Sequence, residues 1–144
     1  MSDADGGVWV DGRPFGLMQF RSLEFTPWSG KAGLSKEPSN VVGVDPEGRV
    51  YAGLHDGLWR LEDGAFRRLD PESPLGVNQI QSLMFDRDGS IWVGHGSLLS
   101  RRSKGVLKTY EARDGLPPTF VRAIVRTTDD DVLLGTEDGV YRVN

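Results

Sequence analysis

A segment of about 41 residues recurs along this 144-residue chain and keeps its register from one copy to the next. Glycine marks the repeat at Gly16, Gly57 and Gly139, which are separated by multiples of 41 residues. An apolar residue follows each marker position, at Leu17, Leu58, Leu99 and Val140. Because self-similarity at a fixed period of roughly 20 to 50 residues is typical of repeat architectures, this period constrains the fold more than any single residue does.

Within each repeat the hydrophobic pattern has a period of two, which is typical of β-strands. The third copy contains four such runs, at residues 79–85, 90–94, 98–102 and 106–110. Between the first two runs, Asp88-Gly89 is expected to supply the positive φ angles of a tight hairpin. Four short antiparallel strands in about 41 residues are the sequence signature of a β-propeller blade.

Two other architectures share some of these features. A helical solenoid has a similar period, but 19 glycines and 8 prolines are spread through the repeats and no helix-period stripe of useful length occurs. An ordinary β-sandwich has similar strands but not the strict period. We therefore predict an all-β fold, a β-propeller segment of about three and a half four-stranded antiparallel blades.

We expect a single propeller segment over residues 1–144. Its parts are a partial blade at 1–34, a blade at 35–75, a blade at 76–116 and a partial blade at 117–144. With strands named a to d from the ring axis outward, the first part carries b, c and d and the last carries a, b and c, which gives 14 strands. Since propellers close into rings of roughly 4 to 8 blades, both end faces need a cover. We expect self-association, or the remaining blades of a longer chain with a larger ring of the seven-bladed type.

Composition excludes several classes of partner. The net charge is −4 and acidic and basic residues are interspersed, so we expect no nucleic-acid partner. There is no cysteine for a disulfide or a thiolate metal site. No apolar run approaches the ~20 residues that a membrane helix needs, and no signal peptide opens the chain. We expect no membrane contact by this segment and no cofactor.

All four tryptophans fall in columns of the repeat. One column lies in the middle of strand b and holds Trp9, Tyr51, Trp92 and Leu133. A large flat side chain there can fill the gap between twisted neighbouring blades. Trp28 and Trp59 align with residues of the other copies in the same way. We therefore assign the tryptophans to the blade core and not to a sugar-stacking platform.

A glycine column closes strand b at Gly53, Gly94 and Gly135, where a side chain would crowd the neighbouring backbone. In the first copy this column holds Asp11, which indicates an irregular first blade. Acidic runs such as 86–89 resemble calcium-loop carboxylates, but an EF-hand loop needs ligands over twelve positions. Asp and Gly are also favoured by turn geometry alone, so we assign these residues to turns.

Four stretches of the chain resemble the two-component regulator propeller repeat, at residues 45–61, 86–94, 115–124 and 134–142. The third copy departs from that pattern at 95–98. The resemblance implies a place in the extracytoplasmic sensor region of a bacterial hybrid histidine kinase or related regulator, hence a periplasmic or extracellular location. Such regions are often linked to carbohydrate sensing.

The resemblance implies a non-catalytic sensory, ligand-binding or interaction module, whose ligand is a carbohydrate or another small molecule. On this pattern ligand contacts come from the loops between strands d and a and between strands b and c. The candidate ligand-binding residues in these loops are His55, Asp56, Asn78, Gln79, His95 and Glu137.

The alternative is a propeller enzyme, similar to a lyase or a glycosidase, with a His and carboxylate site in its funnel. His55 and His95 are the only histidines, and both are expected in b-to-c connections of consecutive blades. A zinc site there would draw its third ligand from Asp56 or Glu137. No serine or threonine lies in a nucleophile-elbow context. We therefore favour polar loop residues, and expect no catalytic residue and no metal site.

Overall fold

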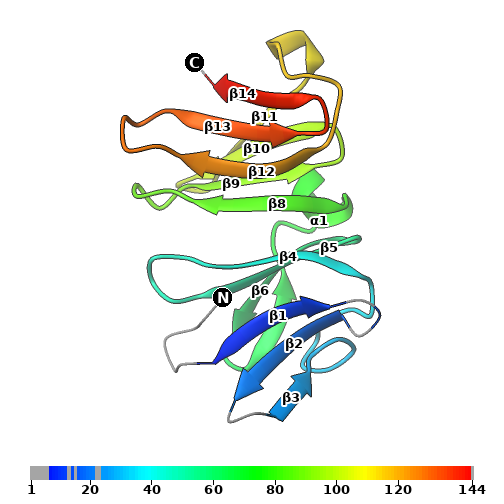
Figure 1. Cartoon of the computed structure of the whole chain (residues 1–144). Coiled ribbons are helices and arrows are strands. Elements are labelled where there is room, and N and C mark those ends of the chain that lie inside the picture. Colours follow the sequence, from blue (N-terminus) through cyan, green and yellow to red (C-terminus); the bar gives the residue numbers. More distant parts are fainter. Residues whose placement is uncertain (1–6, 13, 15, 22–23, 144) are drawn as a thin grey trace.

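The computed structural model describes residues 7–12, 14, 16–21 and 24–143 of the chain. Within these ranges the chain forms 14 β-strands in four antiparallel sheets, which are stacked side by side as propeller blades (Figure 1). The sheets contain 3, 4, 4 and 3 strands in chain order, as the sequence predicts. The all-β propeller fold is thereby confirmed.

Each sheet is a simple meander whose neighbours in sequence are also neighbours in space. The first contains β1 (Val8–Gly12), β2 (Gly16–Arg21) and β3 (Glu24–Pro27). The second contains β4 (Ser39–Val44), β5 (Val50–Leu54), β6 (Gly57–Glu62) and β7 (Ala65–Arg68). The third contains β8 (Ile80–Phe85), β9 (Ile91–His95), β10 (Leu98–Ser103) and β11 (Val106–Tyr110). The fourth contains β12 (Val121–Arg126), β13 (Val132–Thr136) and β14 (Gly139–Val143).

Two short helices lie in the connections between blades and escape the strand-based prediction. One is α1 (Pro74–Val77), where Ser73 caps the N-terminus by accepting a hydrogen bond from the backbone of Leu75. The other is a single 3-10 turn at Ala112–Asp114. None of the helices among the described residues is long and apolar enough to cross a membrane.

The core lies between the blades. Three buried clusters fill the three junctions, and equivalent columns of the repeat supply each of them. Trp9, Tyr51 and Trp92 are each buried against the following blade, as in the T-shaped contact between Trp9 and Phe66 of β7. The aromatic column of strand b therefore fills the junctions, in agreement with its assignment to the core.

The glycine column of strand b shows how tightly the junctions are packed. A Cβ atom on Gly53 would lie 2.5 Å from Ile80 Cγ2, and one on Gly94 would lie 2.7 Å from the carbonyl oxygen of Val121. Gly135, in the last blade, has no following blade against it among the described residues, and its closest approach is 3.3 Å. The crowding therefore comes from the first strand of the next blade together with the first strand of the glycine's own blade, where Val41 and Ser82 approach to 2.6 and 2.4 Å.

The a-to-b turns are structural, although their geometry differs from the expected hairpin. Of the pair Asp88-Gly89, only Gly89 has a positive φ, of 78°. The backbone N–H of Gly89 donates to the Asp86 carbonyl, and that of Asp86 to the Ser90 carbonyl, so the turn is wider than a two-residue loop. The carboxylate of Asp86 pairs with Arg126 of the next blade.

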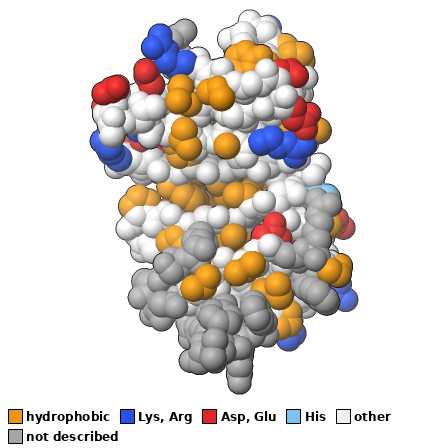
Figure 2. Space-filling view, in the orientation of Figure 1, with side chains coloured by type: hydrophobic (Ala, Val, Ile, Leu, Met, Phe, Trp, Pro, Cys, Tyr) orange, Lys and Arg blue, Asp and Glu red, His pale blue; other side chains and the backbone are white. Residues whose placement is uncertain are grey.

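Both end faces of the stack expose apolar side chains. On β1, Val8 and Val10 are 37% and 38% exposed, whereas their counterparts Val50 and Ala52 are buried under the preceding blade. On the last blade, Val125 and Val140 are 52% and 73% exposed. Figure 2 shows hydrophobic side chains gathered over the sheet of β12 to β14. These faces correspond to surfaces that are covered at every internal junction.

Candidate functional site

The first strands of the blades define one end of the molecule. β8 lies beside both β4 and β12, so these strands form the inner side of the stack (Figure 1). They are antiparallel to β5, β9 and β13, so each begins where its partner ends. We call this edge, with the adjacent connections, the loop end. All six candidate ligand-binding residues lie there.

His55 and Gln79 meet across the junction between the second and third blades. His55 follows β5, and its Nε2 atom lies 2.9 Å from the side-chain nitrogen of Gln79, which donates to it. The backbone N–H of His55 donates to the Pro38 carbonyl. Both side chains are only partly buried. The two residues form an accessible polar pair supplied by two blades.

His95 is not in a loop, contrary to the expectation from its position in the repeat. It is the last residue of β9, and its side chain is fully buried. Its Nε2 atom lies 2.7 Å from Ser100 Oγ, which lies 2.7 Å from Thr109 Oγ1. Its Nδ1 atom lies 3.5 Å from the side-chain nitrogen of Asn78. Burial lowers the pKa of His95 to about 4, so the imidazole is neutral near pH 7.

Asp56 is held by its own blade. Its carboxylate accepts hydrogen bonds from Trp59 Nε1 at 3.1 Å and from the Arg68 guanidinium at 2.9 Å. The Arg68 guanidinium carbon lies 4.8 Å from the centre of the Trp59 ring, within cation–π range. These contacts fix the b-to-c turn of the second blade.

Glu137 takes part in a network that the candidate list misses. Its carboxylate pairs with Arg122 of β12, and Arg122 also donates to Gln81 Oε1 of β8 at 2.8 Å. Arg122 and Gln81 belong to one column of the repeat, 41 residues apart, with Asn40 as the earlier member. The side chain of Asn40 donates to the Ile80 carbonyl at 2.8 Å. Polar residues recur at this position, at the start of strand a, and this recurrence was the sequence signal that could have revealed the network.

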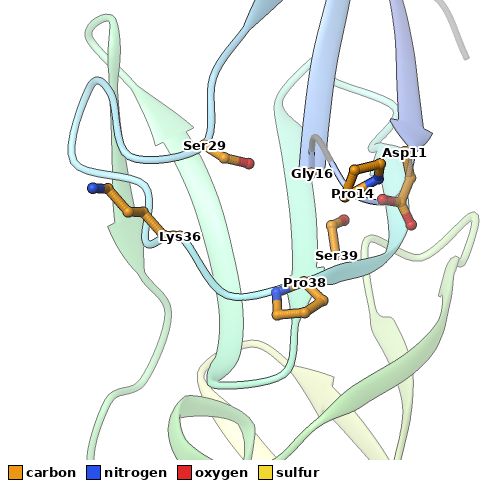
Figure 3. Close-up of a pocket in the computed structure, with 7 residues that line it drawn as sticks. All are labelled: Asp11, Pro14, Gly16, Ser29, Lys36, Pro38 and Ser39. Atoms are coloured by element: carbon orange, nitrogen blue, oxygen red, sulfur yellow. The ribbon is translucent and has the colours of Figure 1, made fainter.

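A cavity of about 430 Å³ opens at the loop end between the first two blades (Figure 3). It is lined by Asp11, Pro14, Gly16, Ser29, Lys36, Pro38 and Ser39. Ser29 Oγ accepts a hydrogen bond from the backbone N–H of Leu17. None of these residues is among the six candidates, although Asp11 interrupts the glycine column and so marks the irregular blade.

The loop end offers hydrogen-bonding groups. Among the described residues, no three His, Asp or Glu side chains are placed to hold a metal ion. The Ser100 and His95 pair is buried, so no substrate reaches it in this conformation. The accessible groups include amides, carboxylates, hydroxyls, the His55 imidazole, the Lys36 amine and the Arg122 guanidinium, which suit the recognition of a polar small molecule.

One segment of the chain matches a known family of propeller repeats. Residues 74–97 match the model of the two component regulator propeller, so the suspected repeat type is confirmed. This segment contains α1, Asn78, Gln79, Gln81 and His95. No curated protein matches the chain.

Solved structures with the same fold include extracellular domains of one and two component systems and a lyase. The extracellular domain of BT4673 from B. thetaiotaomicron, named both as a one component and as a hybrid two component system, matches 96% of this chain with 22% identity and a TM-score of 0.78. That of the hybrid two component system BT3049 from the same organism matches 97% with 15% identity and the same TM-score. The chain spans about 20% of each of these domains. Virginiamycin B lyase from Staphylococcus aureus matches 100% of the chain and 54% of its own length, with 13% identity and a TM-score of 0.73.

Proposed function

We propose that this chain, which carries a two-component regulator propeller repeat, is part of a non-catalytic sensor propeller that binds a carbohydrate or another small molecule at its loop end. The observation that carries the proposal is the position of the matched repeat. Residues 74–97 include the connection that delivers Gln79 and Gln81 to the loop end. The repeat-defining segment is therefore also the segment that presents polar groups there.

The six candidate residues divide into two kinds under this proposal. His55, Gln79 and Glu137 present accessible polar atoms and are the proposed ligand contacts. Asp56, Asn78 and His95 are engaged in hydrogen bonds that hold the turns and the end of β9 in place. Ligand contact by His95 requires a rearrangement because its side chain is buried, and the proposed role of this second group is to position the first group.

The proposal includes a partner for each open face. Val8 and Val10 at one end, and Val125 and Val140 at the other, occupy positions that an adjoining blade covers elsewhere. Further blades of a longer chain, or a second copy of this chain, would cover them in the same way. The similar sensor domains are extracellular, and we extend a periplasmic or extracellular location to this chain.

A propeller lyase is the second candidate, and the likeness of fold to virginiamycin B lyase favours it. Such an enzyme needs an accessible general base near a carboxylate. His55 is the accessible histidine, whereas His95 is buried. Under this alternative, His55→Ala abolishes turnover without changing the thermal melt.

A thermal-shift screen separates the two functions. The purified chain is melted with a panel of neutral, acidic and amino sugars, and the sugars are then assayed for chemical change. The proposal predicts that at least one sugar raises Tm by several degrees at a concentration about 100 times its Kd, and that no sugar is consumed.

Single substitutions test whether the ligand that raises Tm binds at the loop end. His55→Ala and Arg122→Ala are expected to reduce the ligand-dependent shift, because both side chains lie at the loop end. Arg87→Ala is the matched control, since Arg87 is exposed in an a-to-b turn at the opposite end. Turnover of a sugar, or a shift that depends on Arg87 and on neither other residue, contradicts the proposal.

A further inference from the structure

Two columns of the repeat meet at the loop end of every junction. In the second junction, Gly53 of β5 lies against Ile80 of β8, and a Cβ atom on Gly53 would clash with the Ile80 side chain. In the third junction, a Cβ atom on Gly94 would lie 2.7 Å from the Val121 carbonyl oxygen and 3.0 Å from the Val121 Cβ atom. A glycine packed on an apolar β-branched residue therefore closes this position in both junctions.

The first junction has polar residues in both columns. Asp11 stands in the glycine column, and Ser39 stands 41 residues before Ile80 in the apolar column. The cavity of about 430 Å³ lies at this point. The two replacements occur together, on strands 28 residues apart in sequence that face each other across the junction, so the opening results from two changes at one place.

Ser39 is the second sign of a binding site. Its side chain is 3% exposed, and its buried Oγ atom makes no hydrogen bond with any residue that the structure describes. Figure 3 shows this hydroxyl on the side of the cavity that also holds Asp11 and Pro14. A buried hydroxyl without a partner is costly, so its presence here indicates that a ligand group completes the site.

We propose that this cavity binds a small hydroxyl-rich molecule of mono- or disaccharide size. The Asp11 carboxylate and the hydroxyls of Ser29 and Ser39 would hold its hydroxyl groups, and the rings of Pro14 and Pro38 would pack against its C–H faces. The volume lies within the roughly 300–1,000 Å³ of small-molecule pockets. This inference rests on the proposed function, to which it adds a site, and it narrows the ligand to a molecule of mono- or disaccharide size.

The hydrogen-bonding groups around the cavity suit a hydroxyl-rich ligand. The Asp11 carboxylate accepts hydrogen bonds. Lys36 also lines the cavity, but Figure 3 shows its amine directed away from Asp11 and Ser39. The two serine hydroxyls can both donate and accept. A ligand with several adjacent hydroxyl groups matches this set better than a carboxylate, a phosphate or a simple amine.

Isothermal titration of the chain with D-glucose, D-galactose, D-mannose, maltose and cellobiose tests the inference. At least one of these sugars is expected to bind. Asp11→Asn keeps the shape and removes the charge, and should weaken binding by about tenfold or more because the hydrogen bonds are no longer charge-assisted. Ser39→Ile introduces the residue of the second junction and should weaken binding by at least about tenfold, because it removes the hydroxyl and fills the cavity.

The controls keep the outcomes distinct. The Tm of Ser39→Ile without sugar is expected to equal or exceed that of the wild type, which verifies folding. Arg87→Ala, at the opposite end, should bind like the wild type. If a sugar binds and His55→Ala weakens it while Ser39→Ile and Asp11→Asn do not, the ligand lies at the second junction. That result overturns this inference and leaves the proposed function intact. Binding of simple amines but of none of the five sugars also overturns it.

Discussion

Replacement of His95 by leucine is expected to remove a pH dependence from the stability of the chain. The side chain is fully buried and hydrogen-bonded to Ser100. Leu54 occupies the equivalent column in the second blade, so the junction already accommodates leucine at this position. The substitution therefore removes the titrating group with little change in packing.

The magnitude follows from the pKa. Burial lowers the pKa of His95 to about 4 from an unfolded value of 6.5. As the pH falls below 6.5, His95 binds a proton in the unfolded chain but stays neutral in the folded chain. The contribution of His95 to the free energy of unfolding is therefore lost between pH 6.5 and 4 and is fully present above that window. At about 1.4 kcal/mol per pH unit, the wild type should lose about 2 to 3 kcal/mol relative to His95→Leu between pH 7.5 and 4.5.

Urea denaturation followed by tryptophan fluorescence at several pH values between 4.5 and 7.5 measures this difference. Carboxylates titrate in the same range, but they are common to both proteins and cancel in the comparison. Ser100→Ala is the matched control. Since burial and not the hydrogen bond lowers the pKa, this variant should keep most of the pH dependence. A constant stability difference between wild type and His95→Leu across the range would refute the reasoning.

Two other predictions concern the junctions and the end faces. Gly94→Ala should cost about 1 to 3 kcal/mol of unfolding free energy, because its Cβ would lie 2.4 Å from Ser82 Oγ. Gly135→Ala should cost less than about 1 kcal/mol, since its closest contact is 3.3 Å, and equal losses in urea melts would contradict the packing account. The isolated chain should self-associate through its exposed end faces, and Val140→Asp should lower the mass measured by light scattering. A wild-type monomer with all four blades folded would count against this.

The strand pattern was predictable because the residues that determine it recur from one copy of the repeat to the next. The column of Trp9, Tyr51 and Trp92 and the glycines at Gly53 and Gly94 recur because each junction imposes the same packing. Periodicity therefore predicted both the number of strands and their division among the sheets. The assignment of the four blade segments within one domain stays a prediction.

The candidate site was harder to predict, because its properties depend on how the blades meet. The position of His95 in the repeat predicts a loop residue, yet its side chain is buried within the blade and hydrogen-bonded to Ser100, which in turn contacts Thr109. The pairing of Arg122 with Gln81 joins residues 41 positions apart, and only the stacking of strands reveals it. Asp11 was recognisable as an irregularity of the glycine column. The cavity could not be predicted from it alone, because Ser39 lines the same cavity from the other side of the junction.

The most direct test of the central claim, a non-catalytic propeller that binds a small molecule at its loop end, is a backbone amide chemical-shift map. The labelled chain is titrated with a sugar that raises its Tm, and the sugar signals are followed in the same samples. The account predicts shifts confined to the loop end, around residues 36–40, 53–57 and 77–81 and at Asp11, Gly16 and Ser29, with an unchanged sugar spectrum. Shifts centred on the a-to-b turns at 45–49 and 86–90, or conversion of the sugar, would contradict it.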